Sequence, residues 1–378
     1  MKIAHVNYLP TYLPGIQNKI TSQAQAAYFE NLNMDFFILN SELEFNDNNI
    51  FYKKIKFSKS PLLKSIQQKL FRYQIIESLI PFEDYDYIIL RYPLAMGFGM
   101  KSFYRRWGSI IITEHHTIEE QELKTYFQSK LLSLICSFME RKGKHYISKH
   151  TLGMIGVTNE IMMHSNKQVD KKTVVSNGFD IASVDRPARP KYKDRFNMIF
   201  IASRFAIWHG LERIIESAKE YSGPRKINIK LVGKILNPKL IDSLNSFSNE
   251  RVVFEKVGLK KGKELESIYS TTHMGISSMG LYNIGLKEAC VLKTREYIAR
   301  SVPFVYGYED SDLSGNEKFA YKASDDCRLI DFDSIIDFYL DLTENSNYRK
   351  DMETFSLNYI DMKVKVNQMW SFVNKLSN

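Results

Sequence analysis

Two successive series of short apolar runs, separated by stretches with helical periodicity, restrict the fold of this 378-residue chain more than any other feature. Apolar runs of four to eight residues predict strands, and the periodic stretches between them predict helices. Strands are expected over 2–6, 35–39, 85–91, 109–114, 153–157 and 173–175, with helices over 17–32 and 119–149. In the second series, strands are expected over 198–202, 227–232, 252–257, 274–277 and 303–305, with helices over 210–221, 238–246, 262–270 and 291–300. Alternation of this kind indicates α/β domains built on parallel sheets with helices on both faces.

The length of the chain favours two doubly wound domains, because a single core rarely grows past about 250–300 residues. A proline-rich and charged stretch, "SVDRPARPKYKDR" at 183–195, is interpreted as the linker. We therefore expect an N-terminal Rossmann-like domain over 1–185 and a C-terminal Rossmann-like domain over 186–355. The tail 356–378 reads as a helix that packs either locally or back on the first domain. A ligand cleft is expected where the carboxyl ends of the two sets of strands face each other.

The composition is that of a globular protein, with 44% hydrophobic and 25% charged residues. No window approaches the ~18 continuous apolar residues of a membrane span, and the N-terminus reads as a strand instead of a signal peptide. The three cysteines have no metal-ligand spacing, which favours a reduced compartment. We expect a cytoplasmic protein, and a peripheral position on the inner face of the plasma membrane stays open.

That alternative comes from a basic segment at 52–72, which carries seven basic residues and no acidic one in a chain of net charge +9. From Pro61 onward, apolar residues recur at helical spacing and predict a basic amphipathic helix. Its apolar side either packs on its own domain or lies beside an anionic membrane or a lipid-linked phosphate. A nucleic acid partner is disfavoured, because no recognised nucleic-acid-binding motif accompanies the charge.

The sequence "EACVLKTREY" places Glu288 and Glu296 on either side of a predicted helix N-terminus. Backbone amides at such a terminus, together with the helix dipole, attract anions. A loop carboxylate, an amide-rich helix start and a second carboxylate in the helix suit an elongated ligand with a sugar, a diphosphate and a ribose. The alternative is that both glutamates only solvate the end of a helix.

The longer stretch "MGISSMGLYNIGLKEACVLKTREYIARSVPFV" resembles the C-terminal signature of retaining glycosyltransferases of family four, of the bacterial surface-polysaccharide type, which have the GT-B fold. Further segments resemble other motifs of that family: "FIASRFAIWHGLERIIESA", "VVSNGFD", "YLPGIQNKI" and "IIITEHHT". Three positions depart from the family pattern. His209 stands where the family has a lysine, a single Gly15 stands where many members have two glycines, and Val291 replaces a proline.

The resemblance implies a role for each matching residue. Glu288 would accept hydrogen bonds from the transferred sugar, and Glu296 would bind the ribose hydroxyls, since a carboxylate is an acceptor that suits a diol. His115 would contact the sugar near the reacting carbon, with His116 as the rival for that role. The diphosphate would be stabilised by Arg204, by Lys293 as a replacement for the missing lysine, and by the amides of Cys290, Val291 and Leu292. Gly15 and His209 complete the predicted donor-binding set.

The resemblance implies that the enzyme needs no metal or other cofactor and that its donor substrate would be a nucleotide diphosphate sugar. The domain over 186–355 would then bind this donor, and the domain over 1–185 would bind the acceptor. Asp84 and Asp86 imitate an Asp-any-Asp metal motif, but they lead into a strand at the amino edge of the sheet, away from the expected cleft.

The leading hypothesis is a retaining, metal-independent hexosyltransferase acting on an oligosaccharide acceptor, with a lipid-linked one favoured, in capsule or O-antigen synthesis. The alternatives are a nucleotide-sugar 2-epimerase of the same fold and a non-catalytic nucleotide-sugar-binding module. A dehydrogenase is disfavoured, because no G-x-G-x-x-G follows a strand.

Overall fold

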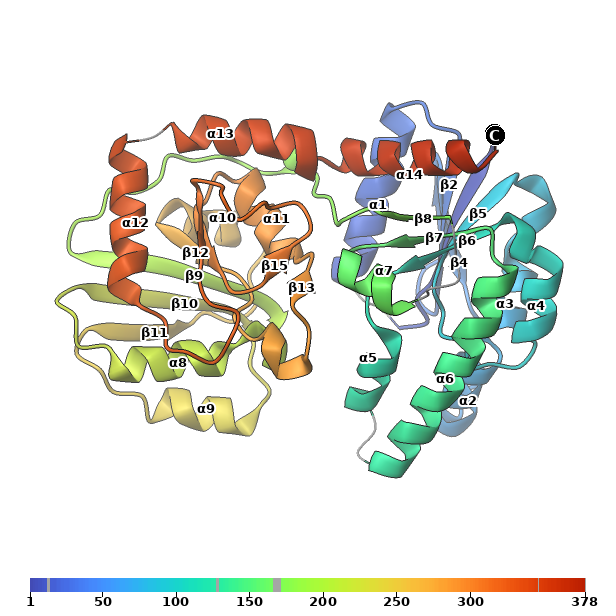
Figure 1. Cartoon of the computed structure of the whole chain (residues 1–378), viewed down its shortest axis with the longest axis horizontal. Helices are drawn as coiled ribbons and strands as arrows, with labels where there is room; N and C mark the ends of the chain where they lie inside the picture. The colour runs from blue at the N-terminus through green and yellow to red at the C-terminus, as the bar shows by residue number, and fades with distance from the viewer. Residues whose placement is uncertain (12–13, 127–128, 166–170, 346, 378) are drawn as a thin grey trace. The chain divides into compact units, whose positions relative to one another are not determined.

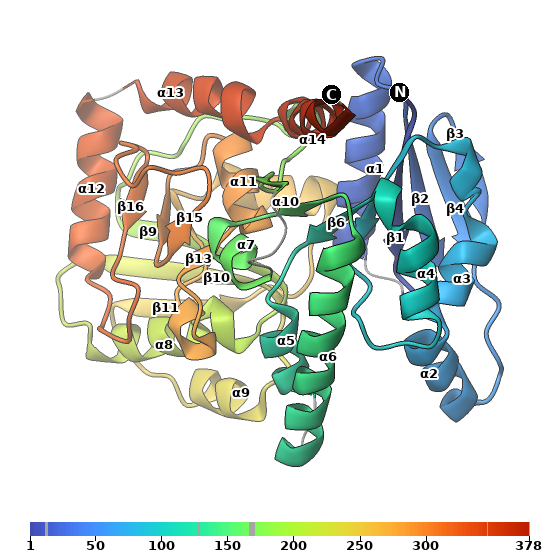
Figure 2. The same ribbon diagram turned by 45° about the vertical axis from the view of Figure 1, so that its right-hand side comes forward.

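The computed structural model describes residues 1–11, 14–126, 129–165, 171–345 and 347–377 (Figures 1 and 2). The chain folds into two compact units. The first contains Met1–Ser176 together with Met362–Asn378, and the second contains Asn177–Asp361. Each unit is a parallel sheet with helices on both faces, the doubly wound arrangement predicted from the alternating pattern.

The sheet of the first unit has the strand order β3-β4-β2-β1-β5-β6-β7-β8 in its described residues. Neighbours are parallel except for the antiparallel pair β3 and β4. Chain order reverses between β1 and β5, so the loops that follow these two strands diverge at the carboxyl edge, as in other doubly wound sheets. The strands are β1 (Ile3–Tyr8), β2 (Met34–Asn40), β3 (Phe45–Asp47), β4 (Ile50–Lys54), β5 (Tyr87–Arg91), β6 (Ile111–His115), β7 (Gly153–Gly156) and β8 (Lys172–Val174).

Helices cover both faces of this sheet because its side chains alternate between two apolar cores. One core joins Ile3 and Ile38 to α1 (Pro14–Phe29) and to the C-terminal helix α14 (Met362–Ser377). The other joins Ala4 and Leu39 to α3 (Arg72–Leu79), α4 (Met100–Trp107) and the second half of α6 (Lys130–His150). The remaining helices of this unit are α2 (Pro61–Leu70), α5 (Glu119–Tyr126) and α7 (Asn159–Ser165).

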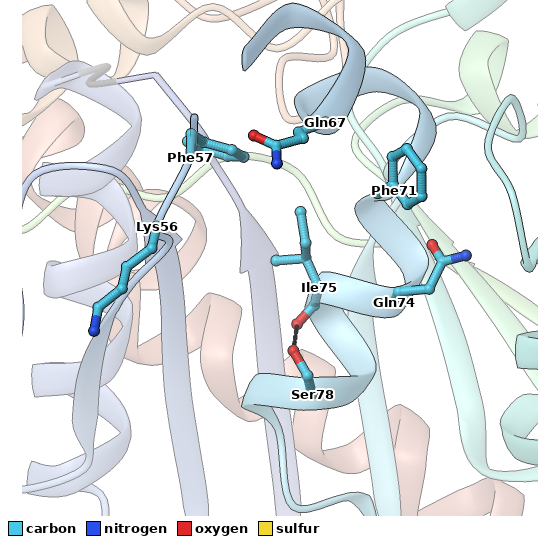
Figure 3. A pocket seen from close by; sticks show the side chains of 7 residues that line it. All are labelled: Lys56, Phe57, Gln67, Phe71, Gln74, Ile75 and Ser78. Atoms are coloured by element: carbon cyan, nitrogen blue, oxygen red, sulfur yellow. Dashed lines mark hydrogen bonds between the residues drawn. The ribbon is translucent and has the colours of Figure 1, made fainter. Parts of the chain in front are cut away.

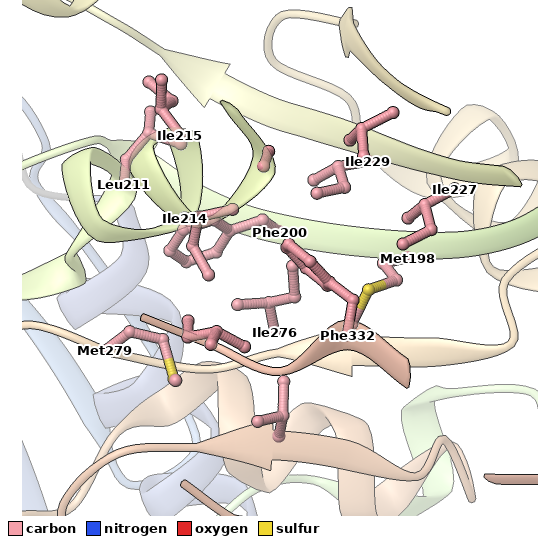
Figure 4. Packing of buried hydrophobic residues seen from close by; sticks show 14 of the residues in the cluster. Met198, Phe200, Leu211, Ile214, Ile215, Ile227, Ile229, Ile276, Met279 and Phe332 are labelled. Carbon is pink, nitrogen blue, oxygen red and sulfur yellow. The ribbon is translucent and has the colours of Figure 1, made fainter. Parts of the chain in front are cut away.

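The sheet of the second unit is parallel throughout, with the order β11-β10-β9-β12-β14-β16. Figure 4 shows Phe200 and Ile276 packed between the sheet and the helix that carries Ile214. On this face lie α8 (Leu211–Glu220), α9 (Pro238–Asn245) and α12 (Phe332–Asn345). The opposite face is covered by α10 (Gly262–Ser270), α11 (Leu292–Ala299) and α13 (Tyr348–Phe355). The strands are β9 (Arg195–Arg204), β10 (Lys226–Lys234), β11 (Val252–Lys256), β12 (Met274–Ile276), β14 (Phe304–Tyr306) and β16 (Ala320–Lys322), with a separate pair formed by β13 (Glu288–Ala289) and β15 (Glu309–Asp310).

The chain passes from one unit to the other at Ser176 and Asp361, whereas the sequence placed the boundaries at 185 and 355. The proline-rich stretch 183–195 lies within the second unit. Arg189 Nη1 donates to the carbonyl of Tyr269 at 2.8 Å, and Arg186 Nε donates to the carbonyl of Ala299 at 2.8 Å. These hydrogen bonds attach the stretch to the second unit, so it is not a free linker.

The basic segment forms part of β4, a connecting loop and α2. The helix α2 buries none of its residues, and Leu62 is 71% exposed. The single helix predicted from Pro61 onward is interrupted at Phe71, which separates α2 from α3. Of the apolar residues in α3, Tyr73 and Ile76 are buried in the core. The first half of the predicted amphipathic helix therefore packs its apolar side on its own domain only in part, since Ile66 and Leu70 are half-buried and Leu62 is exposed.

The Asp84 and Asp86 pair behaves as the expected turn before a strand. Asp84 ends a short 3-10 turn η1 (Phe82–Asp84), and Asp86 Oδ2 accepts from the amide of Lys2 at 2.7 Å. Both residues therefore lie at the amino end of β5.

Replacing Met369 by alanine should lower the free energy of unfolding of the first unit by about 2–5 kcal/mol, because the side chain is buried in the core beneath α14. Urea unfolding measures the change, with Ser371→Ala on the exposed side of the same helix as the control. An unchanged midpoint for Met369→Ala would contradict the packing of α14 on this sheet.

Candidate functional site

Two loops interlock at the carboxyl edge of the second sheet, where chain order reverses between β9 and β12. The loop after β9 contains the 3-10 turn η4 (Ile207–His209), and its His209 carbonyl accepts from the amide of Met279 in the loop after β12 at 2.9 Å. Gly210 has φ +74°, and a Cβ there would lie 2.5 Å from the carbonyl carbon of Met279. Glycine is therefore required at this crossing.

Arg204 and His209 belong to this edge but differ in charge. Arg204 is the exposed last residue of β9, and no carboxylate among the described residues pairs with its guanidinium. His209 Nδ1 accepts from the amide of Ala206 at 2.9 Å. Burial, followed by the nearby Lys293 ammonium, lowers the pKa of His209 to about 2. The imidazole is neutral, so it does not supply the second cation of the family pattern.

Lys293 lies in the first turn of α11 and is buried. Its Nζ lies 4.7 Å from the centre of the Phe200 ring and has no hydrogen-bond acceptor among the described residues. Burial lowers the pKa of Lys293 to about 7. A buried ammonium without an acceptor is costly, and an anion at the start of α11 would remove that cost.

The start of α11 is held by the segment that opens the second unit. Asn177 donates from its amide to Cys290 Sγ at 2.8 Å and from Nδ2 to the Cys290 carbonyl at 2.6 Å. Burial raises the pKa of Cys290 to about 11, so it is a neutral thiol. Val291 is the N-cap and provides no side-chain acceptor for the first turn of α11. The amides from Cys290 to Leu292 thus lead into a helix start without a side-chain cap.

Glu288 lies in the short strand β13, not in a loop as the sequence analysis expected. It pairs with Glu309 of β15, and its Oε1 accepts from Ser311 Oγ at 3.1 Å. The side chain is half-buried.

Glu296 is already engaged within the protein. Its Oε1 accepts from Arg300 Nε at 3.0 Å, and Arg300 also contacts Glu266 at 2.6 Å. Burial raises the pKa of Glu296, although Arg300 opposes the shift. This carboxylate is therefore positioned by a neighbouring guanidinium before any ligand is bound.

Sequence analysis gave Arg295 no role, although it lies between the two glutamates. The side chain is fully buried and forms a bidentate contact with Asp310, a 2.5 Å contact with Asp312 and a 3.3 Å hydrogen bond to the Asn177 carbonyl. Since β15 ends at Asp310 and pairs with β13, Arg295 links α11 to the strand that carries Glu288. The available signal was a cluster of aspartates, Asp310 and Asp312, downstream of a basic residue in the predicted helix.

In the first unit, His115 is the last residue of β6 and is buried. Its ring stacks on Tyr92 with centroids 4.3 Å apart, and Nδ1 lies 2.7 Å from Glu119 Oε1. Glu119 also contacts Lys144 Nζ at 2.5 Å. Burial alone would raise the pKa of Glu119, but His115 and Lys144 together lower it to about 2. The ionised carboxylate accepts from Nδ1 and fixes the orientation of the His115 ring.

The rival residue, His116, is held differently. Its Nε2 lies 3.1 Å from Glu114 Oε2, which also lies 2.9 Å from His5 Nε2. Burial and then Arg91 lower the pKa of His116 to about 3, so this ring is neutral.

Gly15 is in the first turn of α1, and a Cβ added there would meet no atom within 4 Å. Residues 12 and 13 of the predicted glycine loop lie outside the described residues. No steric reason for glycine is found at position 15.

One pocket of the first unit lies between the loop after β4 and the helices α2 and α3 (Figure 3). It has a volume of about 370 Å³ and contains none of the predicted site residues. The lining residues are Lys56, Phe57, Gln67, Phe71, Gln74, Ile75 and Ser78.

Within the described ranges, no three His, Cys, Asp or Glu side chains lie close enough to hold a metal ion. None of the helices in the described part of the chain is long and apolar enough to cross a bilayer.

Solved structures with a similar fold are glycosyltransferases. A glycosyltransferase from Rickettsia africae is 14% identical, with a TM-score of 0.61 over 100% of this chain and 99% of its own. HepE (Alr3699) from Anabaena, in complex with UDP, is 12% identical, with a TM-score of 0.64 over 99% of this chain and 100% of its own. The lipopolysaccharide outer core galactosyltransferase WaaB is 12% identical, with a TM-score of 0.60 and 99% coverage of both chains.

The chain has the GT-B fold. No family model matches the sequence, and no curated protein matches it at a significant level. The similarity to HepE, WaaB and the Rickettsia enzyme is therefore one of structure, at identities that establish the fold alone.

Replacing Arg295 by methionine should lower the free energy of unfolding of the second unit by about 3–5 kcal/mol, because Asp310 would be left buried without its partner. Urea unfolding followed by circular dichroism measures the loss, and the exposed Arg251→Met is the control. Adding Asp310→Leu to Arg295→Met should restore part of the loss, since the uncompensated charge is removed. A single variant as stable as the wild type would show that the ion pair does not hold α11 to β15.

Proposed function

We propose that this protein is a retaining, metal-independent glycosyltransferase that moves a hexose from a nucleotide diphosphate sugar to an oligosaccharide acceptor carried by a lipid. The observation that carries the proposal is the buried Lys293 ammonium at the start of α11. It has no hydrogen-bond acceptor within the part of the chain that the structure describes, and it lies close enough to His209 to lower the pKa of that residue. A diphosphate would supply that acceptor. The GT-B fold and the UDP complexes of the similar HepE support this choice of ligand.

In the proposed complex, the donor lies along the carboxyl edge of the second sheet. The leaving diphosphate develops negative charge, which Arg204, Lys293 and the uncapped amides at the start of α11 would stabilise. Losing one such donor typically costs ~2.7–4 kcal/mol of transition-state stabilisation. Glu296, oriented by Arg300, would accept from the ribose hydroxyls, since an ionised carboxylate is an acceptor with two oxygens.

The sugar would be held by Glu288 and His115. Glu288 is anchored by the β13–β15 pair and by Ser311, so its carboxylate is fixed before the sugar arrives. His115 donates Nδ1–H to Glu119, and we assign Nε2 to a sugar hydroxyl near the reacting carbon. Both residues are oriented by neighbours from the same unit, which limits the entropy lost on binding.

For the acceptor side, we propose that the basic segment 52–72 contacts anionic lipid headgroups. Support comes from α2, which buries none of its residues and keeps Lys64 and Lys69 exposed. Each cation near an anionic surface contributes ~1 kcal/mol of attraction, which salt screens within ~8 Å.

Lys293→Met should weaken UDP binding at pH 7 by about tenfold to a hundredfold, as expected for a lost charged hydrogen bond of ~1.5–3 kcal/mol. Wild-type affinity should fall as the pH rises from 7 to 9, because the ammonium with a pKa of about 7 must regain its proton to bind an anion. The Met variant should lack this dependence. Titration calorimetry at each pH gives both results. Equal affinities and parallel pH profiles would remove Lys293 from the diphosphate site.

The same substitution should stabilise the free protein. Folding lowers the pKa of Lys293, so the cost of burying its charge is fully present below pH 7. This cost decreases as the pH rises and disappears near the pKa of an ordinary lysine. The melting temperature of Lys293→Met should therefore exceed that of the wild type at pH 6, with a difference that shrinks by pH 10.

Transfer should persist in excess EDTA, and the product should keep the anomeric configuration of the donor, as read from proton NMR couplings. Glu288→Gln is the inactive control, because it removes the charge that we assign to sugar recognition. Loss of activity with EDTA and recovery with magnesium would contradict the metal-independent mechanism, and an inverted product would contradict retention. An isomerised sugar formed from donor alone would indicate a 2-epimerase instead.

A further inference from the structure

The first half of α6 has its polarity reversed. Six apolar residues on its outer side are between 46% and 68% exposed, a set that we call the α6 ridge: Leu131, Leu132, Leu134, Ile135, Phe138 and Met139. The side that faces the protein is polar, with Ser133, Ser137, Glu140 and Lys144 buried. An amphipathic helix of a globular protein normally directs its apolar stripe to the core.

Specific contacts prevent α6 from rotating to hide the ridge. Glu140 accepts from the Tyr92 hydroxyl at 2.7 Å and from the amide of Ala95 at 2.9 and 3.0 Å. Lys144 contacts Glu119 at 2.5 Å and Glu120 at 2.9 Å. Turning the helix would carry Glu140 away from the buried Ala95 amide and Lys144 away from the buried Glu119 carboxylate, at a large cost.

The charge around the ridge indicates what could cover it. The exposed cations that follow it on α6 are Arg141, Lys142 and Lys149, and the one described acidic side chain of α6, Glu140, is buried on the other side. Figures 1 and 2 show the first half of α6 and the basic helix α2 at the same end of the first unit. An apolar ridge bordered by cations suits the interface of an anionic bilayer. A second copy of α6 would supply no exposed acidic side chain, among its described residues, to pair with these cations.

We infer that the α6 ridge inserts into the acyl layer of an anionic membrane. This inference extends the headgroup contact proposed for α2, but it rests on α6 alone and not on glycosyl transfer. The ridge would contribute apolar contact, which salt does not screen, whereas the lysines of the basic segment would contribute attraction that salt weakens.

The test compares full-length variants on vesicles of phosphatidylglycerol and phosphatidylcholine at 0.05 M and about 0.5 M salt, where the Debye length falls to a few ångström. The ridge variant carries Leu131→Ser, Leu134→Ser and Phe138→Ser. Its matched control carries Leu236→Ser, Leu259→Ser and Leu329→Ser, three exposed leucines of the second unit. The charge variant carries Lys54→Glu, Lys59→Glu and Lys64→Glu.

We expect the ridge variant to lose at least tenfold in vesicle partitioning at both salt concentrations, while the control partitions like the wild type. The charge variant should lose most of its binding at low salt. A tryptophan at the ridge, Phe138→Trp, should be quenched by brominated lipids, and Leu329→Trp should not. Melting temperature and UDP affinity should be unchanged in the ridge variant, which separates this inference from the proposed transferase activity.

Three outcomes would overturn the inference. The first is a wild type that does not bind anionic vesicles at low salt. The second is a ridge variant that partitions like the wild type. The third is a wild-type dimer in analytical ultracentrifugation that becomes monomeric in the ridge variant, which would assign the ridge to a second copy of the chain.

Discussion

The buried guanidinium of Arg295 connects the helix start of α11 to the strand pair that carries Glu288. It binds Asp310 and Asp312 on one side and the Asn177 carbonyl on the other. Asp310 fixes β15 and through it the strand of Glu288, whereas Asn177 fixes the Cys290 end of the helix start. A buried charge of this kind tolerates few alternative arrangements, because each would leave an ion unpaired in a medium of low dielectric constant. The spacing of Glu288 and Glu296 is thus set by an ion pair that itself takes no part in the proposed chemistry.

Burying a positive charge at the start of α11 lowers the stability of the protein while no ligand is bound. Lys293 is held without an acceptor from any residue that the structure describes, and His209 is neutral beside it. A neutral imidazole cannot replace the lysine that the family pattern has at position 209. The arrangement concentrates positive charge at the helix start instead of distributing it over the loop after β9. Sites of this type often store free energy in the unliganded state, which ligand binding then releases.

Most strands of both sheets could be predicted because a strand buried on both faces reads as a continuous apolar run. The edge strand β16 was missed, since its three residues end in the exposed Lys322. The hairpin of β3 and β4 was missed, since the three residues of β3 are exposed and include Asn46 and Asp47. The stretch 183–195 looked like a linker because nothing in its proline and charge content reveals that Arg186 and Arg189 bind distant carbonyls.

The candidate site residues were found only through a resemblance to a known family, and their roles stay predictions. These residues are Glu288, Glu296, Lys293 and His115. Their positioning partners Arg300, Asp310, Glu119 and Lys144 could not be predicted. Most of these contacts join residues well apart in sequence, and even the short-range ones depend on which helix face is turned inward. The reversed polarity of α6 is hidden for the same reason, because periodicity alone assigns its apolar side to the core.

The position of α14 in the first unit has a consequence for how the chain acquires its structure during synthesis. Its residues Met362, Val366, Met369 and Val373 complete the core beneath α1, yet they are synthesised after the whole second unit. The whole second unit, from Asn177 to Asp361, is made in the interval, which takes on the order of ten seconds or more at typical elongation rates. During that time one face of the first sheet is covered by α1 but lacks α14. The N-terminal part of the molecule is therefore finished after the C-terminal part, the reverse of the usual order for domains joined end to end.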